Sequence, residues 1–492
     1  MRRTVWPIVL AIFFLASGCT LSPKYSRPKA PVPAGWPQGA AYEGVKAPSG
    51  APIAPELSWQ DFFTDPKLQN IIKVALNNNR DLRLAALNVE RARALYGVQR
   101  AELFPSVNAV GSGSKQRGSS DFTRPGEPRT TKQYSVNLGI VSWEIDSFGR
   151  IRSLTEQALQ EYLATEEARR SAQIALVSEV ARAYLTLAAD RENLKLAGST
   201  LHTQEGVYDL IRRQYEVGLA NQLDLRRAQT QVDAARGDVA RYTQLVAQDQ
   251  NALNLLAGSP VPKDLLPPDL ASVSPLKDIS PGLSSEVLLR RPDIMAAEYQ
   301  LKAAYAFIGA ARAAFFPRIS LTTAVGTASD ELSRLFSSGN GTWSFAPQVV
   351  MPIFDARTWA AYRVSKAQRK IALTQYERTI QTAFREVADT LAVRDTVDKR
   401  LSAQQSLVNA LAETYRLSVN RYTNGIDSYL GVLDAQRSLY AAQQGLTSLR
   451  LAKIANQVSL YAVLGGGGGG NSAFLRDEHH QPVPRPADDP AR

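Results

Sequence analysis

The chain has few of the residues on which most enzymes and metal sites depend. Its 492 residues include one cysteine, three histidines and three methionines. A single cysteine cannot form a disulfide within the chain. Zinc-ligand spacings, phosphate-binding glycine loops and the GxSxG and HExxH motifs are also missing. We therefore expect no enzyme activity, no metal site and no cofactor.

The histidines and the longest glycine run have ordinary explanations. His202 stands alone in a helical segment, which predicts a surface position. His479 and His480 lie in a polar, proline-rich tail, where we expect no metal site. The six glycines at 465–470 precede Asn-Ser-Ala rather than Lys-Ser/Thr, so they predict a linker and not a phosphate loop.

No stretch of the chain is dominated by positive charge. A formal net charge of +11 would suit nucleic acid or an anionic membrane surface. However, the lysines and arginines are interspersed with acidic residues, and no run of five basic residues occurs. This pattern favours a solvated surface of mixed charge over a nucleic-acid interface.

Long apolar runs are absent except near the N-terminus. Two arginines precede an apolar run at 5–15, and small residues lead to Cys19. This order predicts a signal peptide over 1–18 and resembles a bacterial lipoprotein, in which the cysteine is acylated. Thr20 is not the aspartate that retains lipoproteins at the inner membrane, so we expect outer-membrane sorting; the alternative is a secreted protein with an incidental cysteine. Because no later segment is a candidate spanning helix, any crossing of a membrane must use strands.

The chain is built from two copies of one unit. Residues 81–105 match residues 293–317 with nine identities in 25 positions, and both segments end in Phe-Pro. A second match, at an offset of 207 residues, joins 213–230 to 420–437 with five identities.

Each copy contains a very long region that predicts helices. No proline interrupts 129–259 or 353–481. We expect helical arms of about 50 residues, or about 75 Å at 1.5 Å per residue. Tight turns are expected near Gly218 and Gly425, because glycine adopts the left-handed conformation that ends a helix.

Apolar residues at heptad spacing predict that these arms pack side by side. The clearest series is Val232, Ala235, Val239, Tyr242 and Val246, followed after Asp249 by Leu253 and Leu256.

Between the Phe-Pro sites and the arms, each copy carries a strand-like pair. Apolar and small polar residues alternate in 134–140, 319–326 and 343–349, and more weakly in 105–114. Alternation with aromatic residues at the strand ends is typical of membrane strands, although a half-buried soluble strand alternates too. Since the smallest barrels need about eight strands, four strands predict that several chains pool theirs.

These signals divide the chain into six parts. They are a signal peptide at 1–18, an extended proline-rich segment at 19–65, a first repeat at 66–258 with its strand pair at 105–145, a connector at 259–282, a second repeat at 283–464 with its strand pair at 317–352, and a glycine-rich linker and tail at 465–492.

Several motifs occur in one characteristic order between about 19 and 470. They are CTLSPKYSRP after the signal, the Phe-Pro strand entries, WEIDSFGR (143–150), MPIFDAR (351–357), NRYTNGIDSYLGVLDAQRSLY and LYAVLGGG. Together they resemble the outer-membrane factors of bacterial efflux systems, the OprM/TolC class, and especially its lipoprotein, drug-efflux branch.

The resemblance implies a mainly α fold with membrane β structure. Three protomers would each give four strands to a 12-stranded outer-membrane β-barrel, continued by a long periplasmic α-helical barrel with a mixed equatorial domain. The implied function is the outer-membrane channel of a tripartite efflux system. Its partners would be a periplasmic adaptor and an inner-membrane pump of the RND type, with small amphipathic compounds as the favoured substrates. The alternative is a lipid-anchored periplasmic scaffold or adaptor without a pore.

The resemblance also implies a gate at the periplasmic tip. Leu430, Asp434 and Arg437 share one helix face and look like the family's constriction leucine, acidic ring and nearby arginine. The first copy has Leu223, Arg227 and Thr230 there, so the charged pattern is not duplicated. The alternative is an ordinary surface ion pair. Asp224 is a weaker candidate for tip contacts.

The two predicted turns resemble the sites at which the family docks its adaptor. They contain Gly218 and Leu219 in the first copy, and Gly425 and Ile426 in the second. Helix capping alone would explain the same residues.

Overall fold

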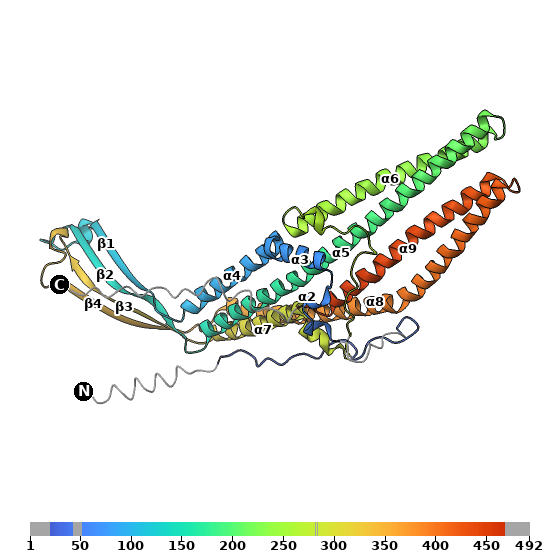
Figure 1. Ribbon diagram of the computed structural model, residues 1–492. Helices are drawn as coiled ribbons and strands as arrows, with labels where there is room; N and C mark the ends of the chain where they lie inside the picture. Colours follow the sequence, from blue (N-terminus) through green and yellow to red (C-terminus); the bar gives the residue numbers. More distant parts are fainter. Residues whose placement is uncertain (1–19, 43–51, 281, 283, 468–492) are drawn as a thin grey trace, which may run out of the picture. The chain divides into compact units, whose positions relative to one another are not determined.

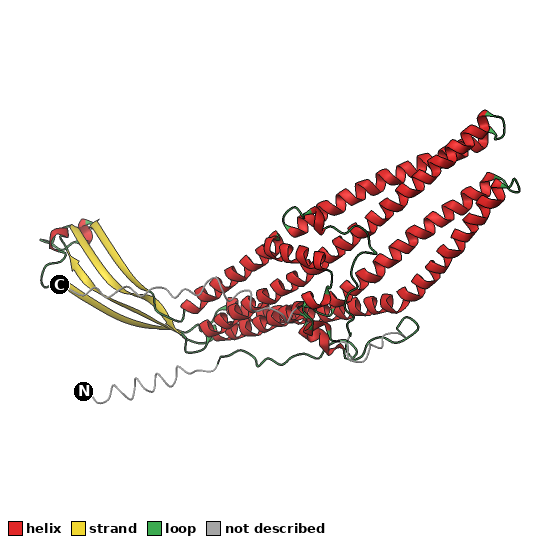
Figure 2. Cartoon of the chain, in the orientation of Figure 1, coloured by secondary structure: helices red, strands yellow, loops and turns green. Residues whose placement is uncertain are grey.

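The fold is described from a computed structural model, in which residues 20–42, 52–280, 282 and 284–467 are described. The predictions for the signal peptide, for Cys19 and for most of the C-terminal tail lie outside these residues. Figure 1 traces the elements along the chain, and Figure 2 separates helices from strands. No helix of the described part is both long and apolar enough to cross a membrane.

The predicted duplication is present in the order of the elements. In chain order the first copy comprises α3 (Pro66–Asn78), α4 (Arg80–Ala101), β1 (Val107–Arg117), β2 (Thr130–Ile145), α5 (Arg150–Glu216) and α6 (Gln222–Ala257). The second comprises α7 (Pro292–Ala313), β3 (Arg318–Ser329), β4 (Gly341–Val350), α8 (Ala356–Thr423) and α9 (Tyr429–Val463). Short elements are η1 (Ala54–Glu56), α2 (Trp59–Phe62), η2 (Ser120–Phe122), η3 (Lys263–Leu265), η4 (Ser285–Arg290) and η5 (Leu332–Arg334).

The predicted arms of about 50 residues are wrong in length. The outgoing helices α5 and α8 have 67 and 68 residues, whereas the returning helices α6 and α9 have 36 and 35. The outgoing helices are longer because they begin almost directly at the strand exits, after Ile145 and Val350.

The first helical segment is also divided, at Asn79. Its side-chain oxygen accepts from the Leu82 N–H at 2.9 Å, which caps α4, and its amide donates to the Leu256 carbonyl at 3.0 Å. Asparagine readily replaces a helical hydrogen bond in this way, so the chain bends between α3 and α4.

Contacts along the backbone group the chain into two compact units. The first holds residues up to 30, 86–168 and 295–379, and the second holds 31–85, 169–294 and the residues from 380 onward. Each unit therefore contains segments of both copies.

The first unit contains a single antiparallel sheet of order β1-β2-β3-β4. Pairing in register gives it two different faces, because side chains alternate along each strand. One face carries the apolar side chains of Val107, Ala109, Val136, Leu138, Ile140, Val325, Trp343, Phe345 and Val349. The other carries the polar side chains of Asn108, Ser112, Gln133, Ser135, Asn137, Thr322, Ser344 and Gln348. The alternation predicted for the strands is confirmed.

The core of the second unit joins distant parts of the sequence. The rings of Phe62 and Tyr461 stack with centroids 4.1 Å apart, and the Tyr461 hydroxyl donates to the Leu57 carbonyl at 2.8 Å. Arg291 forms ion pairs with Asp293 and Glu386 at 2.7 and 3.0 Å. The N-terminal segment, the start of the second copy and the end of α9 are thus held together.

The predicted seam along α6 is present. Val232, Ala235, Tyr242 and Leu253 are buried, and the interruption at Asp249 is retained. The heptad spacing therefore gave the correct face of this helix.

Candidate functional sites at the helical tips and strand exits

The two helical hairpins turn with the same backbone geometry. Gly218 and Gly425 have φ values of +81° and +72°. In each turn the next residue, Leu219 or Ile426, donates its backbone N–H to the carbonyl five positions earlier, at 2.8 and 2.9 Å. This is the Schellman arrangement, which needs a left-handed residue where each glycine stands.

The side chains after these glycines are unusually exposed for their size. Leu219 is 81% exposed and Ile426 is 61% exposed. In the second turn Arg421 also forms an ion pair with Asp427, and this contact lowers the pKa of the Asp427 carboxyl. An apolar tip beside a paired charge could contact another protein, although capping alone explains the glycines.

Below the tips, aromatic side chains pack the two hairpins against each other. Tyr429, Val432 and Leu433 of α9 form a buried cluster with Ile211 and Ala228 of the first hairpin. Burial raises the pKa of Tyr429. The buried face of α9 is therefore occupied by packing within the protomer.

The predicted gate residues lie on the opposite, exposed face of α9. Leu430 is 52% exposed, and Asp434 and Arg437 are exposed as well. Among the ion pairs of the described residues, none joins Asp434 to Arg437. Instead, the Arg437 Nε donates to the Gln231 side-chain oxygen of α6 at 3.2 Å. The simple surface pair is thus not formed, and Asp434 is presented outward.

The first copy arranges its counterpart residues differently. Leu223 is 57% exposed, and Arg227 lies 3.7 Å from Asp224 in an ion pair within α6. The side chain of Asn221 accepts from the Asp224 N–H at 2.8 Å. Asp224 is therefore held at its own helix terminus.

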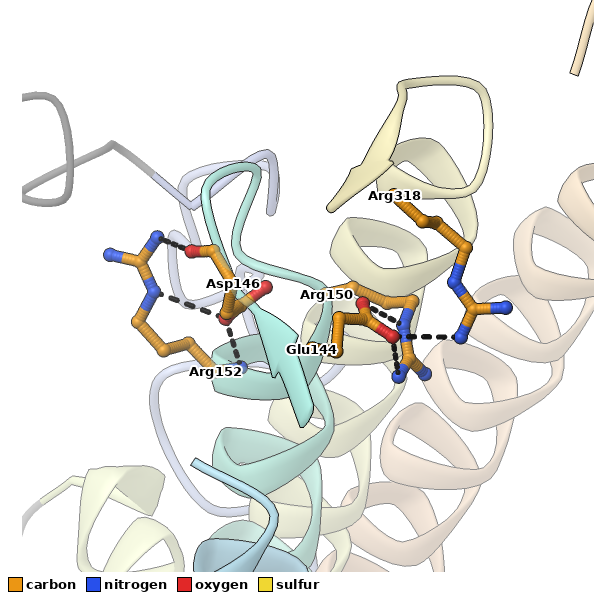
Figure 3. Close-up of polar contacts among 5 residues, drawn as sticks. All are labelled: Glu144, Asp146, Arg150, Arg152 and Arg318. Carbon is orange, nitrogen blue, oxygen red and sulfur yellow. Dashed lines mark hydrogen bonds and ion pairs between the residues drawn. The ribbon is translucent and has the colours of Figure 1, made fainter. Parts of the chain in front are cut away.

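A charged cluster at the exit of β2 was not assigned a role from the sequence. Glu144 accepts from Arg150 through two nitrogens, each at 2.8 Å, and from Arg318 at 2.8 Å (Figure 3). Asp146 accepts from the backbone N–H of Arg152 at 2.8 Å and so caps α5. These contacts tie β2, β3 and α5 together where the sheet ends.

A carboxyl pair accounts for the interruption of the seam in α6. Burial and the neighbouring carboxylate of Asp190 raise the pKa of Asp249 to about 6. One Asp249 oxygen is buried without a hydrogen-bond partner among the described residues. The pair is electrostatically unfavourable when both groups are ionised.

The remaining candidates carry no chemistry in the structure. His202 is exposed on α5. No cluster of three or more His, Cys, Asp or Glu side chains among the described residues could hold a metal ion.

Comparison with known proteins gives this architecture a family. Residues 71–259 and 283–466 match the family described as "Outer membrane efflux protein". The chain belongs to this family. Both matched stretches contain one strand pair and one long helical hairpin, so the family match follows the duplication.

Curated members of the family are similar over almost their whole length. A toluene efflux pump outer membrane protein of Pseudomonas putida, TtgC, is 51% identical over 467 residues, covering 95% of this chain and 96% of the relative. The probable outer membrane lipoprotein SilC of Salmonella typhimurium is 40% identical over 463 residues, covering 93% and 97%.

Solved structures share the fold. A membrane protein from Pseudomonas aeruginosa matches with a TM-score of 0.84 and 41% identity, covering 91% of this chain and 100% of the other. The open state of the Neisseria gonorrhoeae MtrE outer membrane channel matches with a TM-score of 0.81 and 38% identity, covering 91% and 98%. These matches confirm the predicted fold class and the outer-membrane location, and they identify the chain as a transport protein.

Proposed function

We propose that three copies of this efflux protein form a gated channel through the outer membrane. The channel would give passive exit to substrates delivered by an RND-type inner-membrane pump through a periplasmic adaptor. The observation that carries the proposal is the sheet with one apolar and one polar face.

The apolar face of the sheet needs a nonaqueous environment. Trp343 is 81% exposed, Phe345 62% and Val349 64%, and all three lie on that face of β4. Such a patch is unfavourable in water, whereas lipid would cover it and leave the polar face toward a water-filled lumen.

The edges of the sheet support the proposed assembly. Since the order is β1-β2-β3-β4, the outer strands β1 and β4 have unpaired edges within one protomer. Backbone groups in lipid must be hydrogen-bonded, so an open four-stranded sheet cannot span a membrane. Three protomers would pair β1 of one copy with β4 of the next and close the barrel.

We place the gate at the exposed face of α9. In a trimer, three Asp434 side chains near one axis would concentrate negative potential beside the Leu430 constriction. The Arg437–Gln231 hydrogen bond would hold the moving hairpin to its neighbour. The turns at Gly218, Leu219, Gly425 and Ile426 would dock the adaptor, because they present apolar side chains on rigid caps.

We also propose that Cys19 carries the lipid anchor. Arg312 near the end of α7 donates to the Leu21 carbonyl at 3.0 Å, and β3 begins at Arg318. The segment after Cys19 is thus attached close to the start of a membrane strand, where an acyl chain would reach the bilayer.

The two copies, the 259–282 connector and the proline-rich 19–65 segment are proposed as the organisation of the chain. The relatives named for toluene efflux favour small amphipathic compounds as substrates.

Single-channel conductance in planar bilayers tests the function. The wild type should open rarely, and the D434A/R437A double variant should open more often and to a larger conductance. A matched control is R385A/D389A, which removes an exposed ion pair on α8 at 3.9 Å and should behave as wild type. Silence from all three folded, inserted proteins would favour a scaffold without a pore.

A further inference from the structure

The far end of the apolar face is basic in one hairpin of the sheet. From the helix side to the loop side, the apolar-face pairs of β1 and β2 are Val107 with Ile140, Ala109 with Leu138, Gly111 with Val136, Gly113 with Tyr134, Lys115 with Lys132, and Arg117 with Thr130. The face thus changes abruptly from apolar to cationic after Tyr134.

This arrangement places two like charges directly opposite each other. Lys115 and Lys132 are cross-strand partners, and such pairs of equal charge are destabilising. Lys115, Lys132 and Arg117 are all exposed, and no salt bridge of the described residues involves any of them. Within the protomer, therefore, nothing compensates the charge of these three side chains.

The adjoining loop does not supply the missing negative charge. Residues 118–129 contain Asp121 and Glu127, but also Arg124 and Arg129. The loop is electrically balanced, so the positive excess comes from the strand residues.

The second hairpin ends without cations on the same face. Val325 pairs with Trp343, and Thr327 with Gly341, before the strands end. The loop then begins with Asp330 and Glu331. The basic end is thus particular to the first hairpin and is not a consequence of the shared fold.

The position of the cations indicates which partner they suit. A charged side chain on the lipid face costs several kcal/mol at the bilayer centre but about 0–1 kcal/mol near the interface. Tyr134 marks that interface, because its ring packs over Gly113, and Lys132 lies two residues, or about 7 Å, beyond it. The cations therefore belong at headgroup level, next to the side that carries the hairpin loops.

We propose that Lys115, Arg117 and Lys132 form a binding site for the phosphate groups of the outer-leaflet glycolipid, lipopolysaccharide. Phosphate accepts charge-assisted hydrogen bonds from lysine and arginine and would relieve the Lys115–Lys132 repulsion. The glycolipid's acyl chains would cover the apolar face beside Val136 and Leu138. This inference rests on the proposed channel, in which the hairpin loops face outward.

The test measures binding of lipid A to the detergent-purified trimer of the full chain by native mass spectrometry. The K115Q/R117Q/K132Q variant should bind bisphosphorylated lipid A about tenfold or more weakly than wild type. Enzymatically dephosphorylated lipid A should bind both proteins weakly and equally. The control R363Q/K370Q/R378Q removes three exposed cations of α8 and should bind as wild type.

Two further variants and one assay guard against misinterpretation. The K115R/K132R variant keeps the charge and should keep wild-type affinity, even if the glutamine variant assembles poorly. Equal binding of bisphosphorylated lipid A by wild type and K115Q/R117Q/K132Q would overturn the site. So would a variant that loses only its trimer, because the cations would then pair with carboxylates of a neighbouring copy, such as Asp330 or Glu331. Channel conductance is recorded in parallel, so that a failed pore is distinguished from a failed lipid site.

Discussion

At the scale of single residues, the two strand exits differ in how their charges are held. Glu144 at the first exit is largely shielded and accepts three hydrogen bonds from Arg150 and Arg318. Asp355 at the second exit pairs with Arg357, whose side chain is 93% exposed. Shielded networks of charged groups are costly to break, whereas exposed pairs contribute little.

We therefore expect E144Q to lower the melting temperature of the detergent-solubilised protein. Loss of the carboxylate leaves two guanidinium groups without their acceptor, a cost of about 1–3 kcal/mol. D355N is the matched change at the second exit and should leave the melting temperature almost unaltered. Equal effects of the two substitutions would show that the cluster at Glu144 is not stabilising.

A pair of equivalent glycines makes a second residue-scale test. A Cβ on Gly309 would lie 2.1 Å from the Ser22 hydroxyl oxygen and 2.9 Å from the Ser22 backbone nitrogen. Gly97, its counterpart in the first copy, has no atom within 4 Å of such a Cβ. Only the glycine of the second copy is required for the N-terminal segment to approach its helix.

G309A should detach this segment from α7, while G97A should be neutral or slightly stabilising, because alanine favours a helix. Limited trypsin digestion measures the difference. The G309A protein should be cut faster after Lys24 and Arg27, residues that are otherwise retained through Tyr25 and Arg27 contacts to Glu298 at 3.0 and 2.6 Å. Identical digestion of both variants would contradict this reading of the glycine.

At the scale of elements, the carboxyl pair between α5 and α6 predicts a pH dependence. The pKa of Asp249 is raised to about 6 in the folded state, above its ordinary value of 3.8. A raised carboxyl pKa means that folding favours the protonated form. Its contribution to stability is therefore greatest at low pH and declines as pH rises from about 4 through 6.

D249N removes the ionisable group and should stabilise the protein above pH 6, by roughly 1 kcal/mol after allowance for solvent screening. Below about pH 4 the wild type is itself neutral at this position, so the gain should vanish. Melting temperatures of both proteins between pH 4 and 8 provide the measurement. A gain that does not change with pH would point to packing rather than charge.

The sequence predicted the elements better than their lengths. Alternation located β2, β3 and β4, and heptad spacing found the buried side of α6, because each depends on a local period of the side chains. The bend at Asn79 was missed, since it depends on a contact to Leu256, far away in the chain. The unequal arms were missed because the absence of proline limits where helices can run but not where they begin.

The candidate sites were predictable to different degrees. Gly218 and Gly425 were found because their turns require a left-handed residue, which only a few residue types provide. The exposure of Leu430 and Asp434 also followed from the helix period. The partners of Arg437 and Glu144 could not be foreseen, because both lie on other elements and depend on packing. The Lys115–Lys132 pairing likewise requires the strand register.

At the scale of the whole molecule, the proposed channel makes neighbouring residues of one strand face different media. Ser344 lies on the polar face of β4 and Phe345 on its apolar face. Their backbones are adjacent, so a difference between them reports the environment and not the position along the strand.

The most direct measurement is the channel current before and after a membrane-impermeant, charged thiol reagent reacts with S344C or F345C in planar bilayers. Wild type, tested in parallel, controls for Cys19. We predict that the reagent reduces the current through S344C and leaves F345C unchanged, because only the first cysteine lines a water-filled lumen. A current that responds at both positions or at neither would contradict a pore bounded by the polar face of this sheet.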